Sequence, residues 1–252
     1  KFSGWGLSTT TSTPWSGISK NKTFIEFSSA MDNLEIKIKN KEFYLAQIEN
    51  VKENTSFEDV FNHFRELDYR HYVVYFSALY AFENCKSKNI VECGTAEGLT
   101  IFFALSKFKQ DISYKAYLYE SWEAMRKKEL VTEHDKDREG NYSYLDIEST
   151  KKNLNDFNNN IIYNKGFIPD SFKTSINPDK ISWLHIDLNS AMPTFEALKF
   201  FFPKLESKGV ILLDDYGHET YEDTRLIVEK FFENKNVLFF QLMTGQVIII
   251  KN

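Results

Sequence analysis

The sequence has little of what marks a secreted or membrane protein. It has 2 cysteines, Cys85 and Cys93, whose spacing matches neither a metal-binding motif nor a disulfide framework. Cys93 falls in a predicted buried strand, so we expect reduced thiols. No stretch approaches the roughly 20 apolar residues of a membrane span, and the first residues lack the apolar core of a signal peptide. We therefore expect a cytoplasmic protein that does not contact a membrane.

Runs of basic residues are also missing. The net charge is −5 and the isoelectric point is near 5.7, so a nucleic-acid backbone is not an expected partner. With 42% apolar and 27% charged residues, the 252 residues can bury one sizeable core. We expect an N-terminal arm with a small hairpin over residues 1–55 and one main domain over residues 56–252.

The first 55 residues differ in pattern from the rest of the chain. Lys1 to Ala30 is rich in Ser, Thr and Gly without a sustained period, which predicts an irregular arm. Its Trp5 and Trp15 could cover a pocket, pack on a neighbouring subunit, or dock on their own domain. From Leu34 on, apolar and polar residues alternate around Lys39 to Lys41, which predicts the hairpin. Because Trp5 or Trp15 could pack on a neighbouring subunit, the sequence is also compatible with a homo-oligomer.

The most informative stretch is NIVECGTAEG, residues 89–98. An apolar run ends in Glu92 and then breaks into a turn between Gly94 and Gly98, and the next residues have helical spacing. Loops at the carboxyl ends of strands bind ligands in open α/β sheets. The spacing is neither that of a dinucleotide fingerprint nor that of a P-loop. It suits a nucleoside-bearing ligand better than a triphosphate, and an ordinary Gly-containing βα turn is the alternative.

Strand and helix patterns alternate through the rest of the chain. This rhythm predicts a Rossmann-like α/β fold with a mostly parallel sheet, helices on both faces, and a C-terminal antiparallel hairpin. The predicted strands are residues 89–93, 115–120, 160–166, 181–190, 209–217, 237–242 and 246–251. The predicted helices are residues 57–67, 69–85, 99–108, 148–157, 192–205 and 224–234. Thr55 with Glu58, and Thr220 with Asp223, are expected to cap the first and last of these helices.

Two further features point to chemistry at the strand ends. Glu120 ends the second strand and precedes Ser121 and Trp122, a position suited to accept the two hydroxyls of a ribose. A solvated strand-end charge is the alternative. The charged segment from Met125 to Tyr144 interrupts the rhythm, as lids and substrate loops do.

Acidic residues end the fourth and fifth strands. His185, Asp187 and Asn189 are expected on one face of the fourth strand. If the fifth strand is its neighbour, Asp187 comes close to Asp214 and Asp215. Carboxylates this close raise each other's pKa unless a cation is present, and oxygen ligands favour Mg²⁺, Ca²⁺ or Mn²⁺. Such a cation would orient a substrate hydroxyl and lower its pKa. The alternative is that one Asp caps a helix and another is solvated.

The order of the motifs resembles a known family. VECGTAEG, YLYESW, YNKGFIPDSF, WLHIDLNSAMPT, GVILLDDYG and LMTGQVIIIK follow one another as in class I S-adenosylmethionine-dependent methyltransferases. They are most similar to the metal-dependent sugar O-methyltransferases of the macrocin O-methyltransferase type. The resemblance runs from about Tyr69 to the C-terminus. It implies a methyltransferase catalytic domain that uses S-adenosylmethionine and Mg²⁺ or Mn²⁺.

The resemblance also implies roles for individual residues. Glu92, Gly94, Thr95 and Gly98 surround the methionine part of the cofactor, and Glu120 takes the ribose. The remaining predicted cofactor-binding residues are Cys93, Ser121, Trp122, Gly166 and Asp187. The predicted metal ligands are Asp187, Asp214 and Asp215.

The chain departs from the family at one catalytic position. Members often carry an acid, proposed as the general base, where this chain has Asn189, and an amide cannot take a proton at neutral pH. Either Asn189 is a neutral ligand of metal or substrate, or the base lies elsewhere. His185 lies deeper in the fourth strand and is expected to be structural, so His218, on the loop after the fifth strand, is the preferred base.

The sequence thus predicts an O-methyltransferase for a hydroxyl of a sugar or similar small polar molecule. The product would belong to a surface glycan, such as a capsule polysaccharide, or to a secondary metabolite. One alternative is a nicotinamide-dependent oxidoreductase on the same kind of sheet. The glycine spacing, which is not that of a dinucleotide fingerprint, and the three strand-end carboxylates argue against it. A second alternative, motivated by Asn189, is a cofactor-binding module that has lost catalysis.

Overall fold

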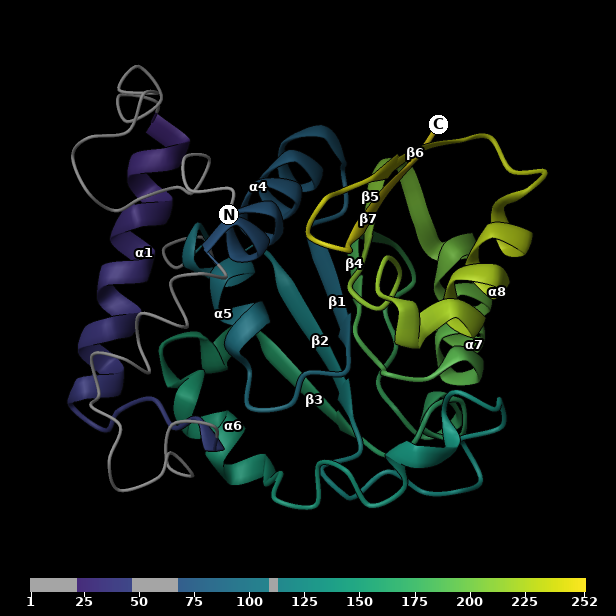
Figure 1. The fold of residues 1–252 in the computed structure, drawn as a ribbon. Coiled ribbons are helices and arrows are strands. Elements are labelled where there is room, and N and C mark those ends of the chain that lie inside the picture. Colours follow the sequence, from purple (N-terminus) through teal and green to yellow (C-terminus); the bar gives the residue numbers. More distant parts are fainter. Residues whose placement is uncertain (1–21, 47–67, 109–112) are drawn as a thin grey trace, which may run out of the picture.

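Seven strands form one mixed sheet in a computed structural model that describes residues 22–46, 68–108 and 113–252 (Figure 1). Their spatial order is β3-β2-β1-β4-β5-β7-β6. The first five strands pair in parallel, and β7 is antiparallel to both β5 and β6. The strands are β1 (Asn89–Cys93), β2 (Lys115–Glu120), β3 (Ile161–Lys165), β4 (Ile181–Ile186), β5 (Leu205–Leu213), β6 (Val237–Gln241) and β7 (Val247–Lys251). The predicted parallel sheet with a terminal hairpin is confirmed.

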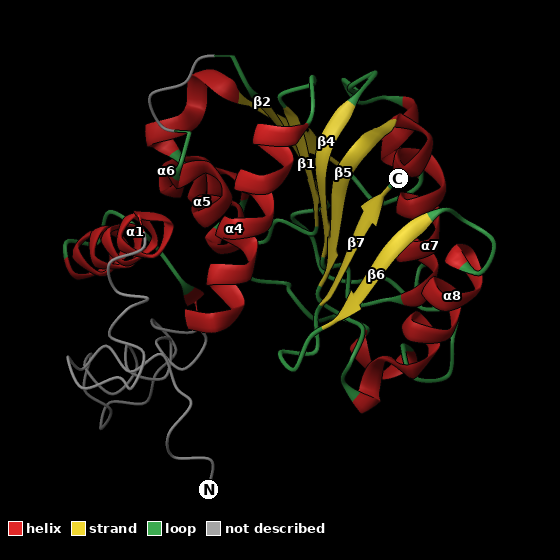
Figure 2. Cartoon of the chain, turned by 90° about the horizontal axis from the view of Figure 1, so that it is seen from above, coloured by secondary structure: helices red, strands yellow, loops and turns green. Residues whose placement is uncertain are grey.

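Helices cover both faces of this sheet (Figure 2). One face carries α4 (Asp68–Asn84), α5 (Leu99–Ser106) and α6 (Ile147–Asn153), and the other carries α7 (Ala191–Phe201) and α8 (Glu222–Phe232). The helix α1 (Lys22–Lys39) packs on α4 and α5. The central strands are therefore apolar on both sides, as buried parallel strands are. Trp183 belongs to the core under α4 and α5, and Leu184 belongs to the core under α7.

The predicted hairpin after Leu34 is wrong, because residues 22–39 form helix α1. The alternation placed Leu34, Ile36 and Ile38 on one face. In the helix, Leu34 and Ile38 are buried one turn apart, whereas Ile36 is 56% exposed. Phe27 and Met31 continue the buried stripe at helical spacing, and this stripe also corrects the irregular arm predicted for residues 22–30. Tertiary packing therefore selected the helical period over the alternating one.

Some of the predictions concern residues that the structure does not describe. Trp5, Trp15 and the predicted helix 57–67 with its Thr55 cap lie outside the described residues, so the domain boundary near residue 55 stays a prediction.

The cap predicted at Thr220 and Asp223 is wrong. The preceding 3₁₀ turn, Glu219–Tyr221, is capped by the ring of His218, and Tyr221 makes no side-chain cap for α8. Among the described helices, none is both long and apolar enough to cross a bilayer.

Strand β4 is shorter than predicted, and its end positions the candidate site. It stops at Ile186, so Asp187 and Asn189 lie on the loop beyond it and do not continue the alternation of one strand face. In the same way β5 stops at Leu213, directly before Asp214 and Asp215. Since β4 and β5 pair in parallel with Ile186 opposite Leu213, both acidic loops leave the sheet at the same edge.

Candidate functional site

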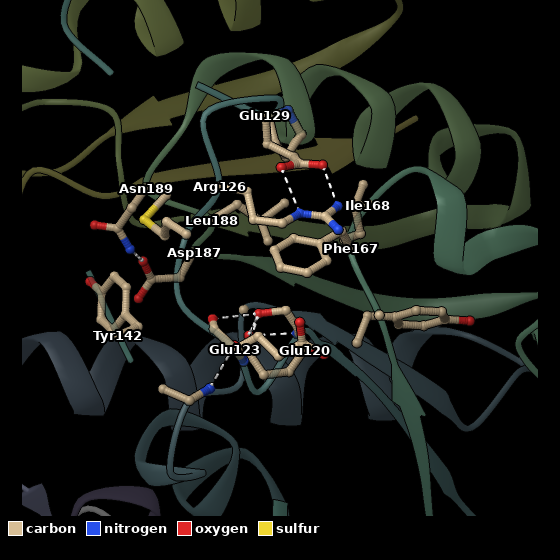
Figure 3. A pocket seen from close by; sticks show the side chains of 17 residues that line it. Glu120, Glu123, Arg126, Glu129, Tyr142, Phe167, Ile168, Asp187, Leu188 and Asn189 are labelled. Atoms are coloured by element: carbon tan, nitrogen blue, oxygen red, sulfur yellow. Dashed lines mark hydrogen bonds and ion pairs between the residues drawn. The ribbon is translucent and has the colours of Figure 1, made fainter. Parts of the chain in front are cut away.

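A cavity of about 820 Å³, including its open mouth, lies beyond the carboxyl ends of the parallel strands (Figure 3). The strand order reverses between β1 and β4 here, which is where α/β sheets bind ligands. The lining residues are Gly94, Ala96, Tyr119, Glu120, Ser121, Glu123, Met125, Arg126, Glu129, Tyr142, Gly166, Phe167, Ile168, Asp187, Leu188, Asn189 and Pro193.

Five predicted cofactor residues lie on this wall, and five do not. The five on the wall are Gly94, Glu120, Ser121, Gly166 and Asp187. The other five are Glu92, Cys93, Thr95, Gly98 and Trp122, all of them outside the set of lining residues. Sequence spacing pointed to loops that reach the cavity but could not separate the lining positions from the buried positions behind them.

The glycine loop is held tightly against the end of β4. Gly94 has φ +86°, and a Cβ there would lie 2.7 Å from the carbonyl carbon of Asp187 and closer still to its oxygen. Its N–H donates to the Tyr119 carbonyl oxygen over 2.9 Å. Gly94 is therefore required for the close approach of two backbones, in addition to lining the cavity. Gly98, also at positive φ, precedes α5 and faces Leu154 instead of the cavity.

The carboxylate of Glu120 organises the turn at the cavity wall. Its Oε2 accepts the Ala96 N–H over 3.0 Å, which fixes the glycine loop. Its Oε1 accepts the N–H of Ser121 over 2.6 Å and that of Trp122 over 3.3 Å. Because a carboxylate oxygen can accept about two hydrogen bonds, Oε2 retains acceptor capacity toward the cavity. Glu120 is thus positioned both to hold the loop and to accept from a ligand hydroxyl.

Trp122 ties neighbouring segments together behind the cavity. It is buried at φ +47°, and its indole N–H donates to the Thr150 hydroxyl oxygen over 2.9 Å. The Thr150 hydroxyl in turn donates to the Ala96 carbonyl oxygen over 2.7 Å. Trp122 therefore fixes the geometry of the glycine loop through helix α6.

An aromatic and cationic wall, missed in the sequence, closes the cavity opposite the carboxylates (Figure 3). The Arg126 guanidinium lies 3.3 Å from the centre of the Phe167 ring. It also donates to both carboxylate oxygens of Glu129, over 2.6 and 3.2 Å. Such a stacked, paired guanidinium is a rigid flat surface. The charged composition of the 125–144 insertion was a signal for a lid, but not for this particular pair.

The insertion is anchored by a buried acid, Asp135. Its Oδ2 accepts the hydroxyl of Ser190 over 2.9 Å and the N–H of Ala191, the first residue of α7, over 3.1 Å. Its Oδ1 pairs with Arg138 over 2.6 Å. The Arg138 guanidinium also lies over the ring of Tyr221. These contacts hold the insertion against α7 and against the loop that precedes α8.

Asp187 and Asp214 converge beside the cavity on one shared cation, the guanidinium of Arg70 in the first turn of α4. Arg70 Nη2 lies 3.2 Å from Asp187 Oδ2 and donates to Asp214 Oδ2. Gln246, from the turn between β6 and β7, donates from its Nε2 to Asp214 Oδ1 over 2.6 Å. Burial raises the pKa of Asp187, and Arg70 opposes that rise. No sequence pattern indicates this role for Arg70 or Gln246.

Asp215 accepts a hydrogen bond from the backbone of Asn189. Its Oδ2 accepts the Asn189 N–H over 2.5 Å. The Asn189 side chain accepts from the Tyr221 hydroxyl over 2.5 Å and donates to Asp187 Oδ1 over 3.2 Å. Burial, with the nearby Asp187 charge, raises the pKa of Asp215 well above its usual range. Asn189, at φ +52°, therefore joins both acidic loops and Tyr221, a position that suits Asn.

The two candidate histidines occupy very different surroundings. His185 is fully buried, with Nδ1 3.0 Å from Glu92 Oε1 and Nε2 3.6 Å from Asp214 Oδ2. Burial first and Arg70 second lower the pKa of His185 to about 3, so its ring is neutral. His218 is exposed, and its Nδ1 lies 2.9 Å from the Thr220 hydroxyl oxygen. It lies outside the set of lining residues.

Comparisons with known proteins add to this geometry. A sequence model of a family described as a methyltransferase domain matches residues 91–216, which is half of the chain. The matched range includes every parallel strand except the first two residues of β1, and both acidic loops. At the level of whole sequences, no curated protein matches.

Solved structures share the fold at low sequence identity. The O-methyltransferase NovP matches with a TM-score of 0.68 and 13% identity, over 91% of this chain and 99% of that one. The calicheamicin methyltransferase CalS11 matches with a TM-score of 0.55 and 11% identity, over 92% and 93%. An O-methyltransferase from Bacillus cereus, solved in complex with SAH, matches with a TM-score of 0.51 and 10% identity, over 89% and 91%. At these identities the matches establish the fold.

Proposed function

Because the chain belongs to the methyltransferase-domain family whose sequence model spans residues 91–216, we propose that it is an S-adenosylmethionine-dependent O-methyltransferase. The acceptor is a hydroxyl of a sugar or a related small polar molecule. One observation carries the proposal: Glu120 and the Asp187–Asn189 segment line one and the same cavity. A nucleoside-bearing methyl donor and a hydroxyl acceptor need such neighbouring sites.

The residues on the wall fit the proposed cofactor. The Oε2 atom of Glu120 can still accept a hydrogen bond from a ribose hydroxyl. The apolar side chains of Ile168 and Leu188 offer surfaces for an adenine ring. Bound there, S-adenosylmethionine would supply the methyl group that is transferred. Trp122 and Gly94 act indirectly, because they hold the loop in the shape that the cavity requires.

The acidic loops fit a divalent cation in their chemistry. Asp187, Asp214 and Asp215 are the proposed ligands, and carboxylates suit Mg²⁺ and Mn²⁺. The convergence of Asp187 and Asp214 supports this, because their oxygens and the ring of His185 lie within 4.8 Å of one another. A cation there would lower the pKa of the acceptor hydroxyl.

The acceptor side is formed by the chain's own polar groups. Tyr142, from the insertion, lines the cavity together with Asp187 and Asn189 (Figure 3). Asn189 is proposed to hold Asp187 in place through its amide, and so takes no proton itself. His218, on the loop after Asp215, remains the proposed general base. We place the product, a methylated sugar, in a surface glycan such as a capsule polysaccharide or in a secondary metabolite.

The test begins with cofactor binding. Calorimetry should show heat with S-adenosylhomocysteine and none with NADH, and the reverse result would favour the oxidoreductase alternative. Methyl transfer from labelled S-adenosylmethionine to a panel of sugars and sugar nucleotides should then identify the acceptor. Binding without turnover on every acceptor would favour a module that has lost catalysis.

A chelator separates the metal from the cofactor. Excess chelator should abolish methyl transfer, Mg²⁺ or Mn²⁺ should restore it, and the affinity for S-adenosylhomocysteine should stay unchanged. Full turnover in chelator would remove the metal from the proposal while leaving the methyltransferase in place. For the base, His218→Gln should lower kcat while leaving the affinity for S-adenosylhomocysteine unchanged.

A further inference from the structure

The Asp187 and Asp214 carboxylates already have a counter-ion that belongs to the chain. The Arg70 guanidinium bridges the two, although its partners lie 117 and 144 positions away in the sequence. The side chain of Arg70 is 32% exposed, whereas that of Asp214 is 4% exposed. The guanidinium thus reaches from the surface into a largely buried acidic pair.

We propose that Arg70 and a divalent cation are mutually exclusive occupants of the Asp187–Asp214 pair, so that Arg70 neutralises the pair until a cation displaces it. The inference rests on the proposed function only in that it concerns the same metal site. It assigns to Arg70 the role of a displaceable internal cation.

The geometry of the pair supports exclusion. Arg70 Nη2 contacts Oδ2 of both aspartates. The other two oxygens, Asp187 Oδ1 and Asp214 Oδ1, accept hydrogen bonds from Asn189 and Gln246. A divalent cation shared by the two carboxylates would therefore compete with Arg70 for the Oδ2 atoms. The guanidinium and a doubly charged ion so close together would also repel each other strongly in a partly buried site. One of the two must leave.

A second observation points to a ligand in this position. The Nε2 atom of His185 is fully buried, has no hydrogen-bond partner among the residues that the structure describes, and lies 3.6 Å from Asp214 Oδ2. In the tautomer whose Nδ1–H donates to Glu92 Oε1, this Nε2 carries a free lone pair. Nε2 is therefore available as a neutral ligand to a cation between the aspartates, and Arg70 makes no hydrogen bond to it.

The position of Arg70 makes its departure feasible. It lies in the first turn of α4, and its guanidinium contacts the carboxylates of Asp187 and Asp214. A partly exposed side chain can rotate toward solvent without opening the core, since arginine is stable in water as a charged group. Asp214 would stay in place meanwhile, because Gln246 holds its other oxygen.

The experiment measures Mn²⁺ affinity by calorimetry in cofactor-free protein. Arg70→Gln should bind Mn²⁺ about tenfold or more tightly than wild type, the scale for removing a hydrogen bond between charged groups. Arg225→Gln is the matched control, because Arg225 is 34% exposed and also pairs with two carboxylates, Glu222 and Glu229. It should leave the affinity unchanged.

A spectroscopic readout separates displacement from simple charge repulsion. The sequence has five arginines, so side-chain signals in arginine-labelled protein can be assigned through the Arg70→Gln spectrum. Mg²⁺ should shift the Arg70 signal alone toward the position of a solvated guanidinium. If Mg²⁺ binds and that signal does not move, the two cations coexist and the proposal is wrong.

Two further outcomes would also overturn the proposal. One is equal Mn²⁺ affinity in wild type and Arg70→Gln, and the other is no Mn²⁺ binding by either protein. Binding of S-adenosylhomocysteine is measured in the same samples. Its persistence shows that only the inference about Arg70 has failed, whereas its absence in every sample shows that the proposed function has failed.

Discussion

The backbone of Gly94 packs against the carbonyl of Asp187 with no room for a Cβ atom between them. This contact joins the loop after β1, where we propose that the cofactor binds, to the loop after β4, where the carboxylate pair begins. Asp187 N–H also donates to the Cys93 carbonyl oxygen over 2.9 Å, so the ladder continues past the strands. Together these backbone contacts fix the two halves of the candidate site relative to each other.

Gly94→Ala should destabilise the fold. A residue at φ +86° costs about 1–2 kcal/mol for any L side chain, and the clash with Asp187 adds to this cost. Urea unfolding provides the measurement. Gly140→Ala is the control, because Gly140 has φ +85° and no atom of the described residues lies within 4 Å of a Cβ there. Equal decreases in the free energy of unfolding of the two variants would show that the clash with Asp187 does not contribute to the destabilisation.

Glu120→Gln should weaken binding of S-adenosylhomocysteine by roughly 1.5–3 kcal/mol, the scale for hydrogen bonds to a charged group. The amide that replaces one oxygen cannot accept from the Ala96 N–H or from a hydroxyl in that place. Calorimetry measures the change. Glu123→Gln, on the same wall with its carboxylate 3.8 Å from the Lys165 ammonium, should bind like wild type. An unchanged dissociation constant in Glu120→Gln would refute the ribose role.

Asp135→Asn should lower the free energy of unfolding by roughly 3–5 kcal/mol, because it leaves the charge of Arg138 without its buried partner. It also weakens the hydrogen bonds at the start of α7. Asp137→Asn, exposed in the same insertion, provides the comparison. If the two variants unfold at the same urea concentration, the insertion is not anchored through Asp135.

The contact between His134 and Asp223 should depend on pH. The hydrogen bond with Asp223 raises the pKa of His134 above 6.5, and the same bond lowers the pKa of Asp223 below 3.8. The histidine contribution is therefore complete below about pH 6.5 and is lost as pH rises through the folded-state pKa. The aspartate contribution is present above about pH 3.8 and is lost as pH falls.

The measurement compares wild type with Asp223→Asn. NMR titration should place the His134 pKa closer to 6.5 in the variant, and the stability difference should fade above the folded-state pKa of His134. Asp170→Asn is the control, because its exposed carboxylate pairs with Lys128 and Lys173, which keep their charge in this range. An unchanged His134 pKa in Asp223→Asn would contradict the assignment.

The sequence was sufficient to predict the sheet, because each buried strand has a local pattern. KAYLYE is bounded by a polar start and the acid Glu120, and it matches β2 over its whole length. The helical stripe of α1 was also in the sequence, but alternation over a few residues competed with it. What decided between them was packing on α4 and α5, which a local pattern does not contain.

The side chains that contact the acidic residues of the candidate site could not be predicted in the same way. The loops around Glu120 and Asp187 were found because they follow strands. Arg70 stands in an amphipathic helix like any surface arginine, and Gln246 stands in a hairpin turn. Their link to Asp214 depends on how α4 and the hairpin pack over the sheet. Such contacts join positions far apart in sequence, so no spacing rule encodes them.

The buried carboxylate of Asp135 also limits how the enzyme could be redesigned. The segment that lines the cavity with Arg126 and Tyr142 is the same segment that satisfies the first backbone N–H of α7. A chimaera that exchanges this loop to change acceptor preference would remove a helix cap from the catalytic scaffold. Such a graft needs an acid at the position of Asp135, so loop exchange and scaffold stability cannot be engineered separately here.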